Sequence, residues 1–128
     1  MPSNYVLGKN ILIKSIINLD IQQFIQFLNY NNFIQTTNNN MNIFHIMAKL
    51  APSREDNERG NKLIKFYSEL INVFAGFFAS LSINQREYID QMLHFKDNDG
   101  DTPLSISNRI NNGLFDNVVD IIENNYAF

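Results

Sequence analysis

The feature that most constrains this chain is an apolar stripe of helical period over residues 61–81. Apolar side chains recur there at steps of three and four residues, which places them on one face of an α-helix. The pattern predicts one long amphipathic helix with a packed apolar face, because aromatic stripes of this kind belong to cores far more often than to cofactor sites. The residues expected to form that core are Phe66, Leu70, Phe74, Phe77 and Phe78.

Capping signals predict further helices on both sides of this one. Ser82 and Gln85 have the spacing of a capping box, in which each side chain bonds the backbone N–H of the other residue, so a helix is expected over 83–94. Asp20 and Gln23 repeat the same spacing ahead of another apolar run. The chain therefore consists of helices joined by short connections.

The remaining patterns predict a single all-α domain. Asn clusters at 29–32 and 38–40 predict turns, since the Asn side chain bonds nearby backbone and tolerates positive φ. No segment alternates with the period of two that a strand requires. A length of 128 residues suits one domain, and a hydrophobic content of 45% is too high for a disordered chain.

Composition removes several classes of function. The chain has no Cys and two His, so disulfides, thiolate zinc sites and cysteine nucleophiles are excluded. The net charge is -3, with residues 97–128 the most acidic part, and no basic stripe is present that could bind nucleic acid directly. No secretory signal is visible, and the longest uncharged stretch, 70–85, is too short to span a bilayer. We expect no cofactor, no metal, no small-molecule substrate and an intracellular location.

Two groups of residues invite a chemical interpretation and a structural one. His45 could be a metal ligand or a general base, but no second His lies at ligand spacing, so we expect its imidazole to bond backbone or a hydroxyl. His94 is expected at the surface. Residues 97–101 imitate the start of a calcium-binding loop, but Thr102 and Asn108 stand where the Gly and bidentate Glu are needed. The charged run 53–60 is expected to be a solvated loop.

Residues 99–107 resemble the start of an ankyrin repeat, whose family pattern is D-G-x-T-P-L-H-x-A. The resemblance implies that Gly100 makes a turn, Thr102 caps a short helix, Pro103 fixes its first dihedral angle and Leu104 enters the core. Ser105 stands in place of the usual His, and we expect the corresponding unit to pack loosely or to act as a cap.

Two earlier segments look like further copies of this motif. Residues 42–48 place Phe44 at the core position and His45 at the position of the family's His, and 8–15 give a fainter copy with Leu12 in the core. The interval from Leu12 to Phe44 is 32 residues, close to the ankyrin period of about 33. The interval from Phe44 to Leu104 is 60, which requires an insertion of about 27 residues.

The implied fold is a short, divergent ankyrin-repeat solenoid of two to three repeats. The units are expected at about 8–35, 39–95 and 97–125, with a helical insertion over 51–95. An array with an insertion in this place is similar to the ankyrin domain of the fungal G1/S cell-cycle transcription factors, the SBF and MBF complexes. The segments that carry this similarity are 43–46, 65–67, 92–93 and 96–102.

The resemblance implies a non-catalytic protein-binding module, with a transcription-factor subunit as the expected partner and a nuclear location in the fungal case. An ankyrin-type effector of a virus or bacterium, cytoplasmic rather than nuclear, is the alternative in the same class. A small helical enzyme and a structural cap of a longer array remain open from other classes. The residues expected to contact a partner are those of the two turns: Asn38, Asn39, Asn40, Asn98, Asp99 and Asp101.

Overall fold

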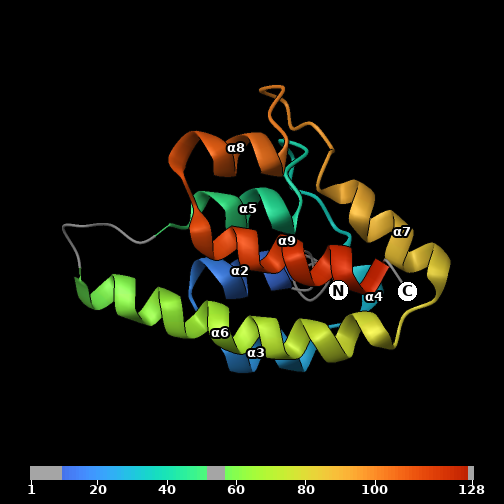
Figure 1. The fold of residues 1–128 in the computed structure, drawn as a ribbon, viewed down its shortest axis with the longest axis horizontal. Helices are drawn as coiled ribbons and strands as arrows, with labels where there is room; N and C mark the ends of the chain where they lie inside the picture. The colour runs from blue at the N-terminus through green and yellow to red at the C-terminus, as the bar shows by residue number, and fades with distance from the viewer. Residues whose placement is uncertain (1–9, 52–56, 127–128) are drawn as a thin grey trace, which may run out of the picture.

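The computed structural model describes residues 10–51 and 57–126, and this described part is all-α (Figure 1). No strand occurs within it, so the predicted class is confirmed. Its helices are α2 (Ile11–Ile17), α3 (Ile21–Phe27), α4 (Tyr30–Phe33), α5 (Ile43–Lys49), α6 (Asn57–Ala79), α7 (Ile83–Met92), α8 (Pro103–Ile110) and α9 (Gly113–Tyr126). Within these residues, no helix has the length and apolarity needed to cross a membrane.

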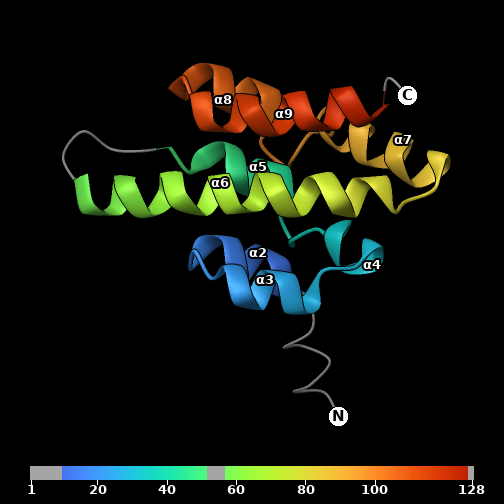
Figure 2. The same cartoon turned by 60° about the horizontal axis from the view of Figure 1, so that its bottom comes forward.

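The helices are arranged in tiers. Figure 2 shows α2 with α3 in the lowest tier, α5 with α6 in the middle and α8 with α9 at the top. α5 packs against both α2 and α8, and α6 packs against both α3 and α9, so two rows of helices run through the tiers. The contact between α5 and α8 is the most extensive between helices, so the third tier does not pack loosely. The other expectation from Ser105, that this unit acts as a cap, stays a prediction.

The core between the tiers is rich in phenylalanine. The ring of Phe33, in α4, is fully buried and lies 5.4 to 5.8 Å, between centroids, from the rings of Phe44, Phe74, Phe77 and Phe78. Three of these four ring pairs are edge-to-face and the fourth is tilted, and edge-to-face is an arrangement that aromatic quadrupoles favour. This phenylalanine cluster joins α4, α5 and α6, and one side chain of α4 lies at its centre.

The first Asn cluster, at 29–32, overlaps the short helix α4, which the sequence did not predict. The side chain of Asn29 accepts a hydrogen bond from the backbone N–H of Asn32 at 2.8 Å and so caps this helix. Asn31 and Asn32 lie inside the helix instead of forming a turn. The prediction of a turn over 29–32 was wrong because an Asn that caps a helix and an Asn that forms a turn use the same side-chain hydrogen bond.

The long amphipathic helix is present as α6. It buries Phe66, Leu70, Phe74 and Phe78 as predicted, whereas Phe77 is only partly buried at the edge of the core. The helix starts at Asn57, before the predicted start at residue 61. Residues 57–60, which were expected to belong to a solvated loop, are therefore helical, and residues 53–56 of that expected loop lie outside the described residues. Residues 8 and 9 of the faint first motif also lie outside them.

The predicted caps are largely as expected. Ser82 and Gln85 bond each other's backbone N–H groups at 3.0 and 3.2 Å. The Asp20 carboxylate accepts the backbone N–H of Gln23 at 3.1 Å, but the Gln23 amide does not return the bond. It donates to the hydroxyl of Ser15 at 2.9 Å instead and thereby ties α3 to α2.

The turns inside the first and third tiers share one backbone geometry. Between α2 and α3, Leu19 has a left-handed φ of 54° and the Asp20 N–H donates to the carbonyl of Ser15 at 2.8 Å. Between α8 and α9, Asn111 has a left-handed φ of 55°, and the Asn112 N–H donates to the carbonyl of Ser107 at 3.0 Å. Both turns therefore end one helix and cap the next in the same way.

Candidate functional site

The segment ahead of α5 ends in a tight turn over 37–41. The Thr37 N–H donates to the Met41 carbonyl at 2.9 Å, and the Asn40 N–H donates to the Thr37 carbonyl at 3.0 Å. Asn40 has a φ of 60°, a conformation that Asn tolerates better than most residues do. The Asn-rich sequence therefore forms a turn here, as predicted, and α5 starts directly after it.

The segment ahead of α8 forms the same turn over 97–101. The Asp97 N–H donates to the Asp101 carbonyl at 2.8 Å, and the Gly100 N–H donates to the Asp97 carbonyl at 3.0 Å. Gly100 has a φ of 81°, a backbone conformation that residues with a side chain rarely adopt. The carboxylate of Asp97 accepts the N–H groups of Asp99 and Asp101, both at 2.9 Å. Its Oδ1 therefore holds the turn together.

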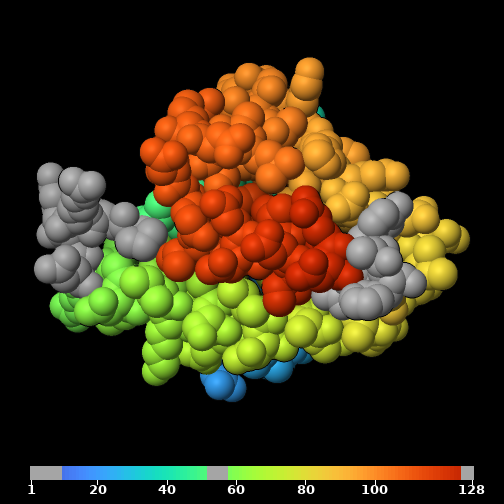
Figure 3. Space-filling model, viewed as in Figure 1, coloured from blue at the N-terminus to red at the C-terminus, as the bar shows by residue number. Residues whose placement is uncertain are grey.

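Hydrogen bonds join the two turns side by side. The Asn98 N–H donates to the Asn39 carbonyl at 2.9 Å, and the Asn40 side-chain amide donates to the Asn98 side-chain oxygen at 2.8 Å. In Figure 1 the second turn projects beyond the helices and the first lies below it, and the second turn is also visible at the edge of the surface in Figure 3. The structure thus brings the predicted contact residues together in one turn surface: Asn38, Asn39, Asn40, Asn98, Asp99 and Asp101.

His45 links α5 to the second turn. Its imidazole is fully buried, and its Nδ1 accepts the Asn42 N–H at 3.0 Å. Nε2 therefore carries the proton and donates to the backbone carbonyl of Asp101 at 3.0 Å. The predicted backbone hydrogen bonding is confirmed. Desolvation lowers the pKa of His45, although the Asp101 carbonyl and the Asp97 carboxylate favour its protonated form.

Asn42 extends this network to α7. Its side-chain oxygen accepts the N–H groups of Phe44 at 2.9 Å and His45 at 3.2 Å, which caps α5. Its amide donates to the carbonyl of Met92 at 2.9 Å, at the end of α7. One buried asparagine therefore satisfies backbone groups at the start of one helix and the end of another.

The charges of the turn surface are only partly available to a partner. Asp101 accepts two hydrogen bonds from the Arg109 guanidinium, at 3.1 and 3.2 Å. This pairing lowers the pKa of Asp101 and raises the pKa of Arg109. Asp99 is exposed, and no ion pair to it occurs within the described residues. Asp99 therefore supplies the charge of this surface that a partner can use.

The motif residues occupy matching places in three helices. Leu12, Phe44 and Leu104 are each the second residue of their helix, in α2, α5 and α8. Leu12 and Phe44 are fully buried, while Leu104 is partly buried against the same core. Thr102 caps α8 with Pro103 at its first position, as the motif implied.

The most important side chain that the sequence did not predict is Asn112. Its buried amide donates to the carbonyls of Ala48 at 2.9 Å, Leu50 at 3.2 Å and Met47 at 3.3 Å, at the end of α5. Its oxygen accepts the Phe115 N–H at 3.2 Å and caps α9. An Asn ahead of a Gly and an apolar run is a recognisable capping signal, but nothing in the sequence indicates the contact with α5.

No metal-binding cluster of three or more His, Cys, Asp or Glu side chains occurs in the described part of the chain. Oδ1 of Asp97, which would be the first ligand of a calcium loop, is already occupied by backbone N–H groups. The local hydrogen bonds thus account for the acidic run 97–101 as a turn.

Comparison with protein-family models, with curated proteins and with solved structures finds no match for this chain. The class that the fold itself defines is an all-α protein.

The buried state of His45 predicts a pH dependence of stability. Because folding lowers the pKa of this imidazole below its ordinary 6.5, the unfolded chain binds the proton more readily than the folded one. The free energy of unfolding should therefore fall as the pH decreases from 7 to about 5.5. Urea denaturation of the wild type and of His45→Gln tests this, since the variant should lose this contribution. The exposed His94→Gln serves as the control and should leave the slope unchanged.

Proposed function

We propose that this protein is a non-catalytic protein-interaction module built from three divergent ankyrin-like units, and that it binds its partner through the turn surface. The units are the helix pairs α2–α3, α5–α6 and α8–α9. The observation that carries the proposal is the pairing of the turns at 37–41 and 97–101, which share one backbone hydrogen-bond pattern and are bonded to each other.

Two numerical offsets support the assignment of units. The turns at 37–41 and 97–101 are separated by 60 residues, the same interval that separates Phe44 from Leu104. The caps Asp20 and Asn112 are separated by 92 residues, the same interval that separates Leu12 from Leu104. Conformations that agree at a constant offset over several positions are typical of repeated units.

The proposed units also change the interpretation of the insertion. α6 lies between α3 and α9, which is the place of the second helix of the middle unit. The extra material is then the additional length of α6 together with α7, rather than α6 as a whole. α7 packs against α9 and is held to α5 through Asn42, so it extends the stack without covering the turns.

The turn surface has the chemistry of a polar contact site. Its side chains are mainly amides, and the hydrogen bonds between the turns hold the backbone in place before a partner arrives. A preorganised surface loses less entropy on binding than a flexible loop does. With Asp99 as its available charge, the surface suits a segment that offers hydrogen-bond donors and a basic side chain. A nuclear role beside a transcription regulator rests on the sequence resemblance alone.

Site-specific crosslinking in the native cell tests the proposal. A photoreactive benzoylphenylalanine at Asn38, which is exposed on the turn surface, should give discrete protein adducts. The same group at Asn72, which is exposed on α6, should not give these adducts. Adding Asp99→Lys to the Asn38 variant should reduce the adducts by about fivefold, as expected for the loss of a favourable charge pair and its replacement by a repulsive one.

Either of two results would contradict the proposal. Equal adducts from Asn38 and Asn72 would show that the turn surface is not the contact. If the adducts from Asn38 persist at full yield after Asp99→Lys, the charge of Asp99 does not contribute to partner binding. Far-UV circular dichroism of each variant confirms that the exposed substitutions leave the helices intact.

A further inference from the structure

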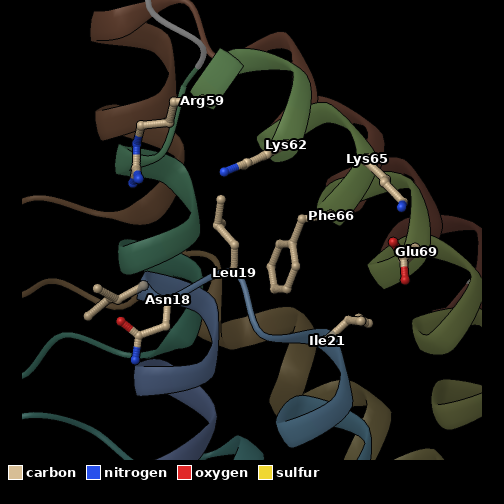
Figure 4. Close-up of a pocket in the computed structure, with 9 residues that line it drawn as sticks. Asn18, Leu19, Ile21, Arg59, Lys62, Lys65, Phe66 and Glu69 are labelled. Atoms are coloured by element: carbon tan, nitrogen blue, oxygen red, sulfur yellow. The ribbon is translucent and has the colours of Figure 1, made fainter. Parts of the chain in front are cut away.

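An open groove of about 540 Å³ lies between the α2–α3 turn and the first half of α6. None of its lining residues belongs to the turn surface. Its floor is apolar and includes Leu19, Ile21 and Phe66. Figure 4 shows the Phe66 ring at the centre of the groove, between the two other side chains. Ile17 also lines the groove and is 49% exposed, so the apolar surface extends to the rim.

The wall formed by α6 is basic. Arg59, Lys62 and Lys65 follow each other at steps of three residues and line the groove together. Glu69, one turn beyond Lys65, adds the one carboxylate of the lining. Figure 4 shows the Lys62 amine pointing across the opening. Lys62 is also 3.5 Å from Glu58, but both side chains are largely exposed, so this pair is weak and easily exchanged. Three cations against one carboxylate give the groove lining a net charge of +2, in a chain whose net charge is -3.

The opposite wall contains a residue in a costly conformation. Leu19 has a φ of 54°, which is unfavourable for a bulky side chain. The matching position of the α8–α9 turn has Asn111 at a φ of 55°, and Asn tolerates this conformation. The Leu19 side chain lines the groove and packs on the core. Residues held in such conformations cluster at ligand-binding sites, where the surrounding structure maintains them.

We propose that this groove binds an acidic segment of a partner protein, which places one apolar side chain on the partly exposed Leu19 and Ile21, above the buried Phe66 ring, and its carboxylates on Lys62 and Lys65. Charge complementarity selects the acidic segment, and the apolar floor selects a peptide over a simple anion or a nucleic-acid backbone. The site is separate from the turn surface, where Asp99 favours a basic partner. The module therefore offers two contact sites of opposite charge.

Fluorescence anisotropy with a defined peptide tests this proposal. The probe is a fluorescein-labelled octapeptide in which Asp and Glu flank a central Leu-Phe pair. The double substitution Lys62→Gln with Lys65→Gln should weaken its binding about fivefold at low salt, as expected for the loss of two exposed ion pairs. The control Lys49→Gln with Lys96→Gln changes the net charge equally at exposed lysines outside the groove lining and should have less than a twofold effect.

Leu19→Asn separates binding from folding. The substitution introduces the residue type that the chain itself uses at the matching turn, so relief of the backbone conformation offsets the lost packing. We expect the thermal midpoint to stay within about 3 °C while peptide affinity falls about fivefold. In an ¹⁵N-correlated spectrum, the peptide should shift the amides of residues 62–69 and of the α2–α3 turn, and should leave the turn surface unchanged.

Four outcomes would overturn the proposal. The first is the absence of shifts at residues 62–69 at millimolar peptide. The second is an equal loss of affinity in the Lys49 and Lys96 control. The third is tighter binding of polyuridylate than of the peptide, with the same lysine dependence, which would assign the groove to nucleic acid. The fourth is a concentration-dependent dimer in sedimentation that the Lys62 and Lys65 substitutions abolish, which would assign it to a second copy of the chain.

Discussion

Replacing Phe33 by alanine is expected to lower the free energy of unfolding by about 3 to 5 kcal/mol, although Phe33 belongs to a helix of only four residues. The side chain is fully buried, and its ring packs against those of Phe44, Phe74, Phe77 and Phe78. Its removal leaves a cavity between α4, α5 and α6 that these rings cannot fill without leaving their rotamers. Urea denaturation followed by far-UV circular dichroism measures the loss.

Phe27→Ala is the matched control for this experiment. Phe27 ends the preceding helix and is 38% exposed, so its removal should cost about 1 kcal/mol or less. Similar losses for the two variants would show that Phe33 is not the centre of the core. Because small domains are stable by only about 5 to 15 kcal/mol, the full loss at Phe33 would remove a large fraction of the total stability.

Asn112→Asp is expected to destabilise the protein by about 3 to 5 kcal/mol at pH 7, although Asp and Asn cap helices about equally well. The Asn112 amide donates to the carbonyls of Met47, Ala48 and Leu50, and a carboxylate has no proton to donate. The substitution therefore places a buried negative charge against three carbonyl oxygens. Part of the loss should be recovered as the pH falls and the carboxyl group becomes protonated, which denaturation at pH 7 and pH 4.5 measures against the wild type.

The reverse change at the corresponding cap provides the control. Asp20 caps α3 with an exposed carboxylate, and Asp20→Asn keeps the acceptor that Gln23 uses. We expect a change within about 0.5 kcal/mol, since the site is solvated and both residue types accept this bond. A loss at Asp20 as large as that at Asn112 would mean that the cap, rather than the bridge to α5, explains the effect.

The parts of the fold that the sequence predicted depend on short-range signals. The stripe of α6 and the capping box of Ser82 with Gln85 are each complete within a few turns of helix, so they can be recognised without tertiary information. The turn at 97–101 has its own determinants in Asp97 and Gly100. Local signals predict each turn by itself; that the two turns lie on one surface depends on a contact between Asn40 and Asn98, which are 58 positions apart.

The features that the sequence did not predict depend on partners far apart in the chain. Asn112 acts on carbonyls of α5, more than 60 residues earlier, and the groove joins Leu19 to Phe66 across two tiers. A capping pattern does not indicate which other helix the cap residue contacts. The left-handed conformation of Leu19 is set by the turn rather than by leucine, so residue preference argued against it.

The bond between the side chains of Asn40 and Asn98 spans 58 positions of the chain. The second turn can dock only after α6 and α7 have been synthesised, whereas α2 and α3 meet across three residues. Closing such a long loop has an entropic cost that local contacts do not have, and it slows folding. On the ribosome, the face that α5 will offer to α8 therefore stays uncovered until α8 emerges. During that interval the nascent chain is the form most exposed to chaperones and to aggregation.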